Sequence, residues 1–208
     1  MSFTPRYTQP TDLSTWYGSY NAYNRFSSYN VGNCTWYAYG RTGEIAGENG
    51  MPNIYSDFRI TAGNGDGKYW IYNTWPEYTF TSGAIDIHAG DILVYGSDSG
   101  SGHVEIVEAV NGSSLRTSYS VYGDSWGTAT YFNTRVIGYP TWSSTMGTVI
   151  DNNGVSHTYS NPFIGYIHNK YITGPEPPTP TTLMPWLTAA LRLRLKRMAR
   201  ATIKRRYK

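Results

Sequence analysis

The single cysteine of this 208-residue chain, Cys34, lies directly before a segment that favours a helix, in the stretch Gly32-Asn-Cys-Thr-Trp-Tyr37. The partial positive charge at a helix N-terminus lowers the pKa of a thiol, and the thiolate is the nucleophilic form of cysteine. A lone cysteine can equally be a small buried apolar side chain without chemistry. The pattern makes Cys34 a candidate nucleophile, provided that the chain also supplies a base.

The best candidate for that base is His103, in the stretch Ser101-Gly-His-Val-Glu-Ile-Val107. The alternation of side chains predicts a strand with His103 and Glu105 on one face. A histidine that takes the thiol proton, an oxyanion hole and a polar group that orients the ring are the parts of a cysteine hydrolase. A helix-borne cysteine followed by a strand-borne histidine is the order found in papain-like cysteine hydrolases.

The elements that must position these two residues follow from the turn signals. The cysteine segment reads as a short helix that ends at Gly43, and Asn111-Gly112 is a strong hairpin turn. Strands are expected at Lys68–Asn73, Tyr78–Thr81, Asp91–Tyr95, His103–Val110, Leu115–Tyr122, Thr130–Ile137, Gly147–Ile150 and Phe163–Tyr171. We therefore predict an α+β fold in which the helix that bears the cysteine packs on a twisted antiparallel sheet.

The composition agrees with a strand-rich domain, since the chain holds 20 Tyr, 22 Gly and 7 Trp and only 15% charged residues. One cysteine excludes an intramolecular disulfide. No apolar run approaches the ~20 residues of a membrane span, and the first ten residues lack the apolar core of a signal peptide. If the protein acts outside its cell of origin, we expect another route of release.

Charge divides the chain into two parts. Residues 1–180 hold eight basic and fourteen acidic side chains, a net charge of −6, whereas residues 181–208 hold nine basic side chains and no acidic one. A proline-rich stretch at the junction predicts a stiff linker. We expect a Tyr/Ser/Asn-rich lead-in at 1–27, a catalytic domain at 28–172, a linker at 173–182 and a basic amphipathic helix at 183–208.

Three segments of the domain resemble the CHAP family, the cysteine/histidine-dependent amidohydrolase/peptidases of bacterial and phage cell-wall lysins. They are Gly32-Asn-Cys-Thr-Trp-Tyr37, Gly90-Asp-Ile-Leu-Val-Tyr95 and Gly102-His-Val-Glu-Ile-Val-Glu108. The stretch Pro162-Phe-Ile-Gly-Tyr-Ile167 is similar to the closing strand of such domains. The resemblance spans roughly residues 28–172 and implies a papain-like fold with Cys34 as nucleophile and His103 as general base and later acid.

The resemblance is less complete for the remaining catalytic groups. The family usually places Gln before the cysteine as an oxyanion donor, where this chain has the shorter amide Asn33. The family also tends to carry Glu and Asn on the strand after the histidine strand, and the stretch 116–124 has neither at the expected place. Ser118, Ser120 and Asp124 remain as candidates to orient the imidazole. Asp124 is favoured because a carboxylate also stabilises the protonated ring.

Metal sites have weaker support. The remaining histidines lack a spacing such as His-x3-His, which argues against zinc catalysis. Some CHAP domains bind calcium near the cysteine helix, and Asn64-Gly-Asp-Gly67 resembles a fragment of a calcium loop, with Asp57 and Asp66 as candidate ligands. The expectation is that catalysis requires no cofactor, with Ca²⁺ as the open alternative.

The resemblance implies a peptidoglycan hydrolase that cleaves an amide bond, either as an N-acetylmuramoyl-L-alanine amidase or as an endopeptidase. It also implies a phage lysin that stays in the host cytoplasm until release at lysis, or that rides on the virion tail. One alternative is a non-catalytic wall-binding or tail structural protein with a degenerate CHAP fold. Another places the function in the basic tail, which we expect to bind an anionic wall polymer or membrane rather than nucleic acid.

Overall fold

The computed structural model describes residues 3–11, 16–17, 32–48, 66–72, 78–84, 86–96, 100–121, 132–141, 143–150, 154–169 and 172. The chain divides into two compact units, residues 1–174 and 175–208, and every described residue belongs to the first. The predicted basic helix, the whole predicted linker and most of the lead-in therefore lie outside the described residues.

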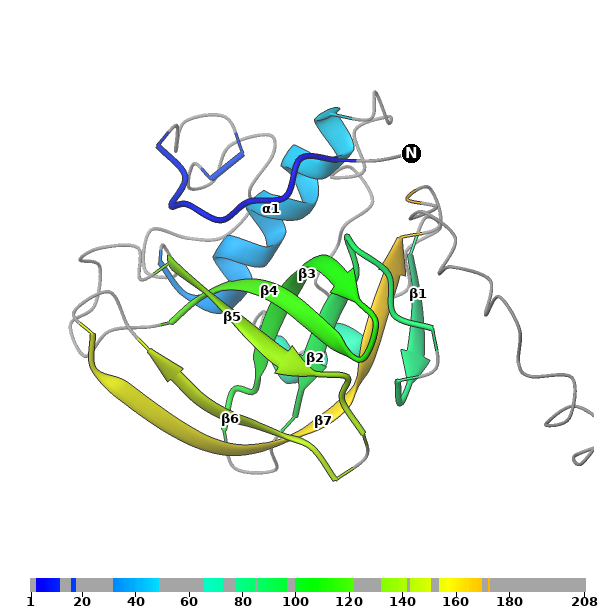
Figure 1. Ribbon diagram of the computed structural model, residues 1–208, viewed down its shortest axis with the longest axis vertical. Coiled ribbons are helices and arrows are strands. Elements are labelled where there is room, and N and C mark those ends of the chain that lie inside the picture. Colours follow the sequence, from blue (N-terminus) through cyan, green and yellow to red (C-terminus); the bar gives the residue numbers. More distant parts are fainter. Residues whose placement is uncertain are drawn as a thin grey trace, which may run out of the picture. The chain divides into compact units, whose positions relative to one another are not determined.

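The described part of the first unit consists of two helical segments and seven strands (Figure 1). In chain order these are α1 Cys34–Glu48, the 3₁₀ helix η4 Gly67–Tyr72, β1 Tyr78–Ser82, β2 Ile92–Tyr95, β3 His103–Asn111, β4 Ser114–Ser120, β5 Phe132–Gly138, β6 Thr145–Ile150 and β7 Ser156–Asn169. The strands form an antiparallel sheet in the order β1-β7-β2-β3-β4-β5, and β6 pairs with β7. This confirms the predicted α+β fold with the cysteine on the helix.

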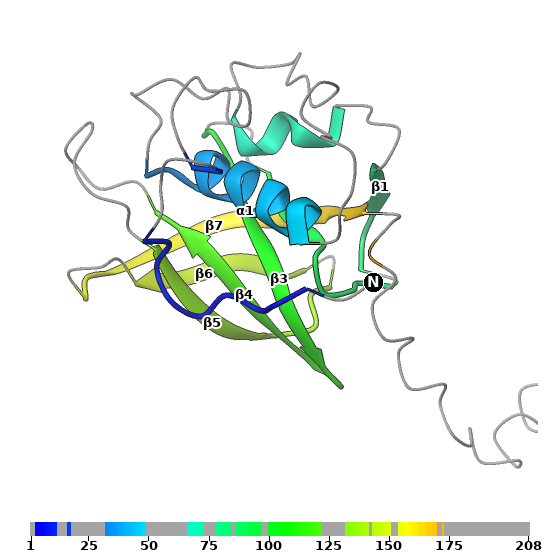
Figure 2. The same ribbon diagram turned by 90° about the horizontal axis from the view of Figure 1, so that it is seen from above.

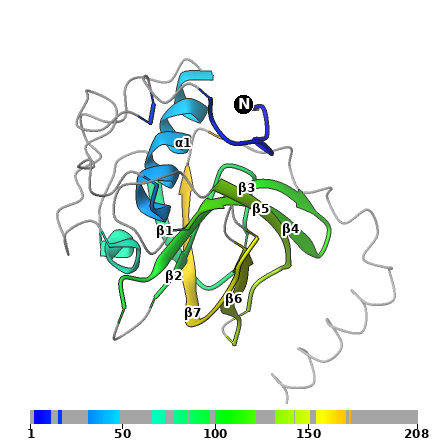
Figure 3. The same cartoon turned by 90° about the vertical axis from the view of Figure 1, so that its left-hand side faces the viewer.

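The sheet has a core on each face. Helix α1 covers one face and contacts β3 and β4, as Figures 2 and 3 show. Strand β2 feeds both cores because its side chains alternate: Ile92 and Val94 face the α1 side, whereas Leu93 and Tyr95 join a second cluster with residues of β4, β6 and β7. All four are buried, so β2 is a rigid central strand beside β3, which begins at His103.

Two sequence predictions about elements are wrong. Helix α1 continues past Gly43 to Glu48, because Ile45 and Ala46 beyond it are buried in the core. A Cβ on Gly40 would lie 2.4 Å from the ring of Tyr17. The aromatic stretch predicted as a strand at Lys68–Asn73 forms the 3₁₀ helix η4 instead, because tertiary contacts override strand propensity. The backbone N–H of Lys68 donates to Ser101, so η4 is fixed against the segment before β3.

Among the described residues, no helix has both the length and the apolar character required to cross a membrane.

Candidate active site

The first turn of α1 fixes the position of Cys34. Asn33 is the N-cap: its side-chain oxygen accepts hydrogen bonds from the backbone N–H of Trp36 at 2.7 Å and from the Thr35 hydroxyl at 2.9 Å. Gly32 before it has a φ of +97°, which glycine adopts without strain. Cys34 is consequently the first residue of the helix.

The start of β3 fixes His103 in a similar way. Gly102 has a φ of +72°, and a Cβ there would lie 2.5 Å from the carbonyl oxygen of Tyr95 and 2.7 Å from the backbone nitrogen of Lys68. A Cβ on Gly67 would come within 3.1 Å of the His103 backbone. Glycine is therefore required where η4 and β2 close around the histidine.

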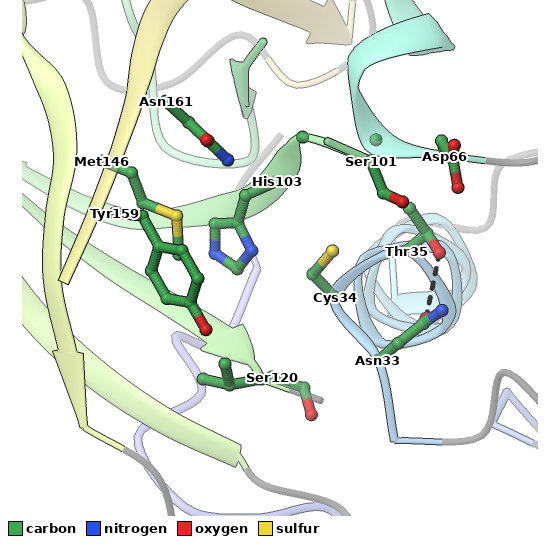
Figure 4. Close-up of a pocket in the computed structure, with 13 residues that line it drawn as sticks. Asn33, Cys34, Thr35, Asp66, Ser101, His103, Ser120, Met146, Tyr159 and Asn161 are labelled. Carbon is green, nitrogen blue, oxygen red and sulfur yellow. Dashed lines mark hydrogen bonds between the residues drawn. The ribbon is translucent and has the colours of Figure 1, made fainter. Parts of the chain in front are cut away.

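Cys34 and His103 lie in one pocket with a volume of about 370 Å³. Figure 4 shows their side chains pointing toward one another. The pocket is lined by Asn33, Cys34, Thr35, Asp66, Gly67, Ser101, Gly102, His103, Ser120, Val121, Met146, Tyr159 and Asn161. Among the described residues, the lining contains one acidic side chain, Asp66, and no lysine or arginine, which disfavours an anionic group next to the sulfur.

The electrostatics of the pocket favour the protonated form of the His103 imidazole. Burial alone would lower the pKa of His103, but Cys34, through its charge and a hydrogen bond, and the neighbouring Glu105 raise this pKa from 6.5 to about 9. The imidazole is therefore protonated at neutral pH when the sulfur is a thiolate. A thiolate beside a protonated imidazole is an activated cysteine nucleophile with its proton donor in place, and the pocket brings these two groups together.

The carboxylate next to His103 belongs to Glu105, two residues further along β3. One carboxylate oxygen of Glu105 lies 3.2 Å from Nε2 of His103, a charge contact whose geometry falls short of a hydrogen bond. Glu105 is completely buried. Its burial favours the neutral acid, but Arg135, His103 and Thr117 lower the pKa of Glu105 below its usual range, so that it stays ionised. Glu105 is the group that stabilises a protonated His103.

Arg135 of β5 holds Glu105 in place. Its guanidinium contacts both carboxylate oxygens of Glu105, through Nη2 and through Nε at 3.2 Å. The remaining nitrogen, Nη1, donates to the carbonyl oxygens of Met146 at 2.6 Å and Thr148 at 3.1 Å on β6. The Thr117 hydroxyl donates to Glu105 at 2.7 Å. A bidentate arginine fixed at its far end leaves the carboxylate little freedom to turn away from the imidazole.

The structure gives the other predicted site residues different contacts. The Ser118 hydroxyl donates to Glu108 at 2.6 Å and accepts from Tyr37 at 2.8 Å, on the side of the sheet that α1 covers. Ser120 lines the pocket, but its hydroxyl donates to the carbonyl oxygen of Gly32 and so supports the turn before Cys34. Asp124 lies outside the described residues, and its role stays a prediction. The oxyanion role of Asn33 also stays a prediction.

Of the candidate ligands named for the predicted calcium site, the structure describes only Asp66. Asp66 lines the catalytic pocket, whereas Asp57 and Asn64 lie outside the described residues. Ca²⁺ therefore remains an alternative that rests on the sequence.

Sequence reasoning placed Glu105 on the face of His103 but gave it no role, because the family pattern pointed to the next strand. The alternation of β3 was the signal that could have identified it, since residues i and i+2 of a strand are neighbours on one face. Arg135 had no local signal, because it reaches Glu105 only through the pairing of β5 with β4.

Comparison with known proteins agrees with the resemblance. Residues 24–122 match the family model of the CHAP domain. Two solved structures of Ly7917 are similar. The first, with the hydrolyzing product of MDP, has a TM-score of 0.41 and 20% identity over 67% of this chain and 54% of that chain. The second has a TM-score of 0.37 and 16% identity over 65% and 73%. This chain thus spans about half the length of the first. No curated protein matches.

Proposed function

Because residues 24–122 match the CHAP domain, we propose that this chain is a cysteine-dependent peptidoglycan hydrolase that cleaves an amide bond of the bacterial cell wall. One observation carries the proposal: Cys34 and His103 face one another in a pocket, and the pKa of His103 is raised to about 9. A structural cysteine has no need of a charged imidazole beside it.

The residues suggest the following course of reaction. The thiolate of Cys34 attacks the amide carbonyl carbon, and the backbone N–H groups of Cys34 and Thr35, which precede the capped N–H of Trp36, stabilise the oxyanion. His103 donates its proton to the nitrogen of the leaving amine as the C–N bond breaks, which leaves a thioester on Cys34. His103 then takes a proton from water, the resulting hydroxide attacks the thioester, and Cys34 departs as thiolate. Glu105 keeps its charge throughout and stabilises the imidazolium.

The buried carboxylate of Glu105 also bears on the non-catalytic alternative. A degenerate CHAP fold was considered because the usual third residue is missing from the strand after the histidine strand. Glu105 supplies a carboxylate to the same imidazole from the histidine strand itself. This favours an active hydrolase over a wall-binding or tail structural protein.

The test is hydrolysis of purified Gram-positive walls by the full chain, followed by loss of turbidity and by zymography. Cys34→Ala and His103→Ala should each abolish activity while thermal unfolding stays nearly unchanged. A matched control is His157→Ala, a histidine of β7 that does not line the pocket. Wall degradation by Cys34→Ala would remove the proposed function. Mass spectrometry of the released fragments distinguishes a muramoyl-alanine amidase from an endopeptidase.

The proposed biological setting is a phage lysin that acts at lysis or at entry, with residues 183–208 as an anchor. This segment has nine basic side chains and no acidic one. Its apolar side chains include four at helical spacing, Leu187, Leu191, Leu195 and Met198. Each basic side chain near an anionic surface contributes about 1 kcal/mol within a Debye length. Deleting residues 175–208 should leave hydrolysis of soluble wall fragments intact and weaken sedimentation with walls or anionic vesicles, most strongly at low salt. Binding that neither salt nor the deletion changes would exclude the anchor.

A further inference from the structure

A second cluster of polar side chains lies at the opposite end of β2 from His103. It consists of His88 and Asp91, from the turn before β2, and His168, near the end of β7. Each offers one ligand atom, and these atoms all lie within 4.8 Å of one another. We propose that His88, Asp91 and His168 form a binding site for a divalent cation of the zinc class, separate from the catalytic pocket.

The turn and the sheet hold the backbones of the three residues in place. The Asp91 carboxylate accepts the backbone N–H of His88 at 2.7 Å through one oxygen and contacts Nδ1 of His168 at 2.8 Å through the other. The turn is joined to β3, because Val107 exchanges backbone hydrogen bonds with Gly90 and Asp91. His168 lies opposite Thr79 in the pairing of β7 with β1. Ligands on rigid elements need little reorganisation to bind a metal.

The environment of His88 points independently to a missing ligand. Its Nδ1 is buried and has no hydrogen-bond partner among the described residues. Its other ring nitrogen, Nε2, lies 3.6 Å from a carboxylate oxygen of the exposed Asp86. Metal-binding imidazoles present one nitrogen to the metal and direct the other at a carboxylate. A buried imidazole nitrogen left without a partner is costly, and a cation would remove that cost.

The donor set selects the kind of cation. Two imidazole nitrogens and one carboxylate oxygen suit zinc, cobalt or nickel, whereas calcium and magnesium take oxygen ligands. Bonds of about 2.0–2.2 Å place the ligand atoms of a tetrahedral zinc about 3.5 Å apart, so the cluster would contract by about 1 Å. The side chains of His88 and His168 are 18% and 28% exposed, which leaves both rings room to move and lets the ion enter from solvent.

The location argues for a structural role. Strand β2 spans four residues, about 13 Å at the usual rise, between Asp91 and the end that pairs with His103. A cation would join the turn before β2 to strand β7. These two segments are remote from one another in the sequence. The spacing of the histidines gave no sign of this, because His88 and His168 are 80 residues apart and meet only through the sheet.

The experiment uses the full chain with Cys34→Ala, because a thiolate next to an imidazole can itself bind zinc. Zinc binding is measured by competition with a chromophoric chelator, and the thermal unfolding midpoint is measured with and without zinc. We expect one equivalent of bound zinc and a raised midpoint. Cobalt substitution should give a visible spectrum without a thiolate charge-transfer band.

Substitutions in that background locate the site. His88→Ala and His168→Ala should each weaken zinc binding at least about 10-fold, and His157→Ala, the matched control, should leave it unchanged. Should His168→Ala fail to fold, His88→Ala provides the test. The buried Nδ1 of His88 makes no hydrogen bond that this substitution would remove, so the variant should still fold. Absence of zinc binding in the folded parent, or equal affinity in all three variants, overturns the proposal. With Cys34 intact, His88→Ala should still degrade walls at the parental rate, so the outcome is independent of the proposed function.

Discussion

Strand β3 carries two buried glutamates, Glu105 and Glu108, whose surroundings are nearly alike. Each is in contact with an arginine that reaches both carboxylate oxygens, Arg135 for Glu105 and Arg41 for Glu108. Each also accepts a hydrogen bond from a hydroxyl of β4: Glu105 from Thr117, and Glu108 from Ser118. Alternation along the strand directs Glu105 toward the second core and Glu108 toward α1.

The two glutamates differ in the remaining partner of the carboxylate. Glu108 accepts the backbone N–H of Arg6 at 2.8 Å, so all its partners are structural. Glu105 instead faces the imidazole of His103. The same arrangement of carboxylate, arginine and hydroxyl therefore serves packing on one face and contacts the imidazole of the predicted base on the other. What makes a buried ion pair functional here is the single neighbour that can change its protonation state.

Glutamine substitutions should separate the two roles most strongly. Glu105→Gln should lower the turnover number at least about 10-fold, because acid–base catalysis contributes about 10²–10⁴-fold and the imidazolium loses its counter-charge. Glu108→Gln should keep the turnover number per folded molecule. It should lower the free energy of unfolding by about 3–5 kcal/mol, the cost of breaking a buried pair.

Wall hydrolysis per folded molecule and chemical denaturation measure these effects. Asp124→Asn is the matched control for the alternative third residue. Full activity in Glu105→Gln together with a large loss in Asp124→Asn would transfer the orienting role to Asp124, and the comparison of the two glutamates would lose its basis.

The pKa of His103 gives a finer measurement of the same comparison. NMR titration of the ring should give a pKa of about 9 in the parent. Cys34→Ala and Glu105→Gln should each lower it, because each removes a negative neighbour, whereas Glu108→Gln should leave it unchanged. A parental pKa close to 6.5 would contradict the ion pair.

The sign of the pH effect on stability follows from this pKa. Because the value is raised in the folded state, the protonated ring contributes stability that is fully present below pH 6.5 and is lost as the pH rises through about 9. Denaturation curves between these limits should show this loss in the parent and a smaller one in Cys34→Ala.

The sequence could predict the parts of this arrangement that depend on neighbours along the chain. The single cysteine before a helix-forming segment and the alternation around His103 are short-range signals, and they made these two residues the predicted nucleophile and base. Helix α1 extends beyond its predicted end at Gly43. The packing of Tyr17 against Gly40 could not be predicted from the helix sequence alone. Arg135 is 30 residues beyond Glu105, and only the pairing of β5 with β4 places it there.

The smallest effects are expected from the two hydroxyls, and they sharpen the comparison because they alter neither arginine nor carboxylate. Ser118→Ala removes a donor to Glu108 and an acceptor for Tyr37, so it should cost about 1–3 kcal/mol of unfolding free energy and leave turnover unchanged. Thr117→Val removes one donor to Glu105 while Arg135 still holds the carboxylate. An activation barrier raised by about 0.4–1 kcal/mol corresponds to a turnover lowered about 2- to 5-fold. Steady-state kinetics and denaturation on both variants provide the measurement. Should Ser118→Ala slow turnover and Thr117→Val not, the hydroxyl on the α1 side would be the one coupled to the imidazole, and Glu105 would be the structural member of the pair.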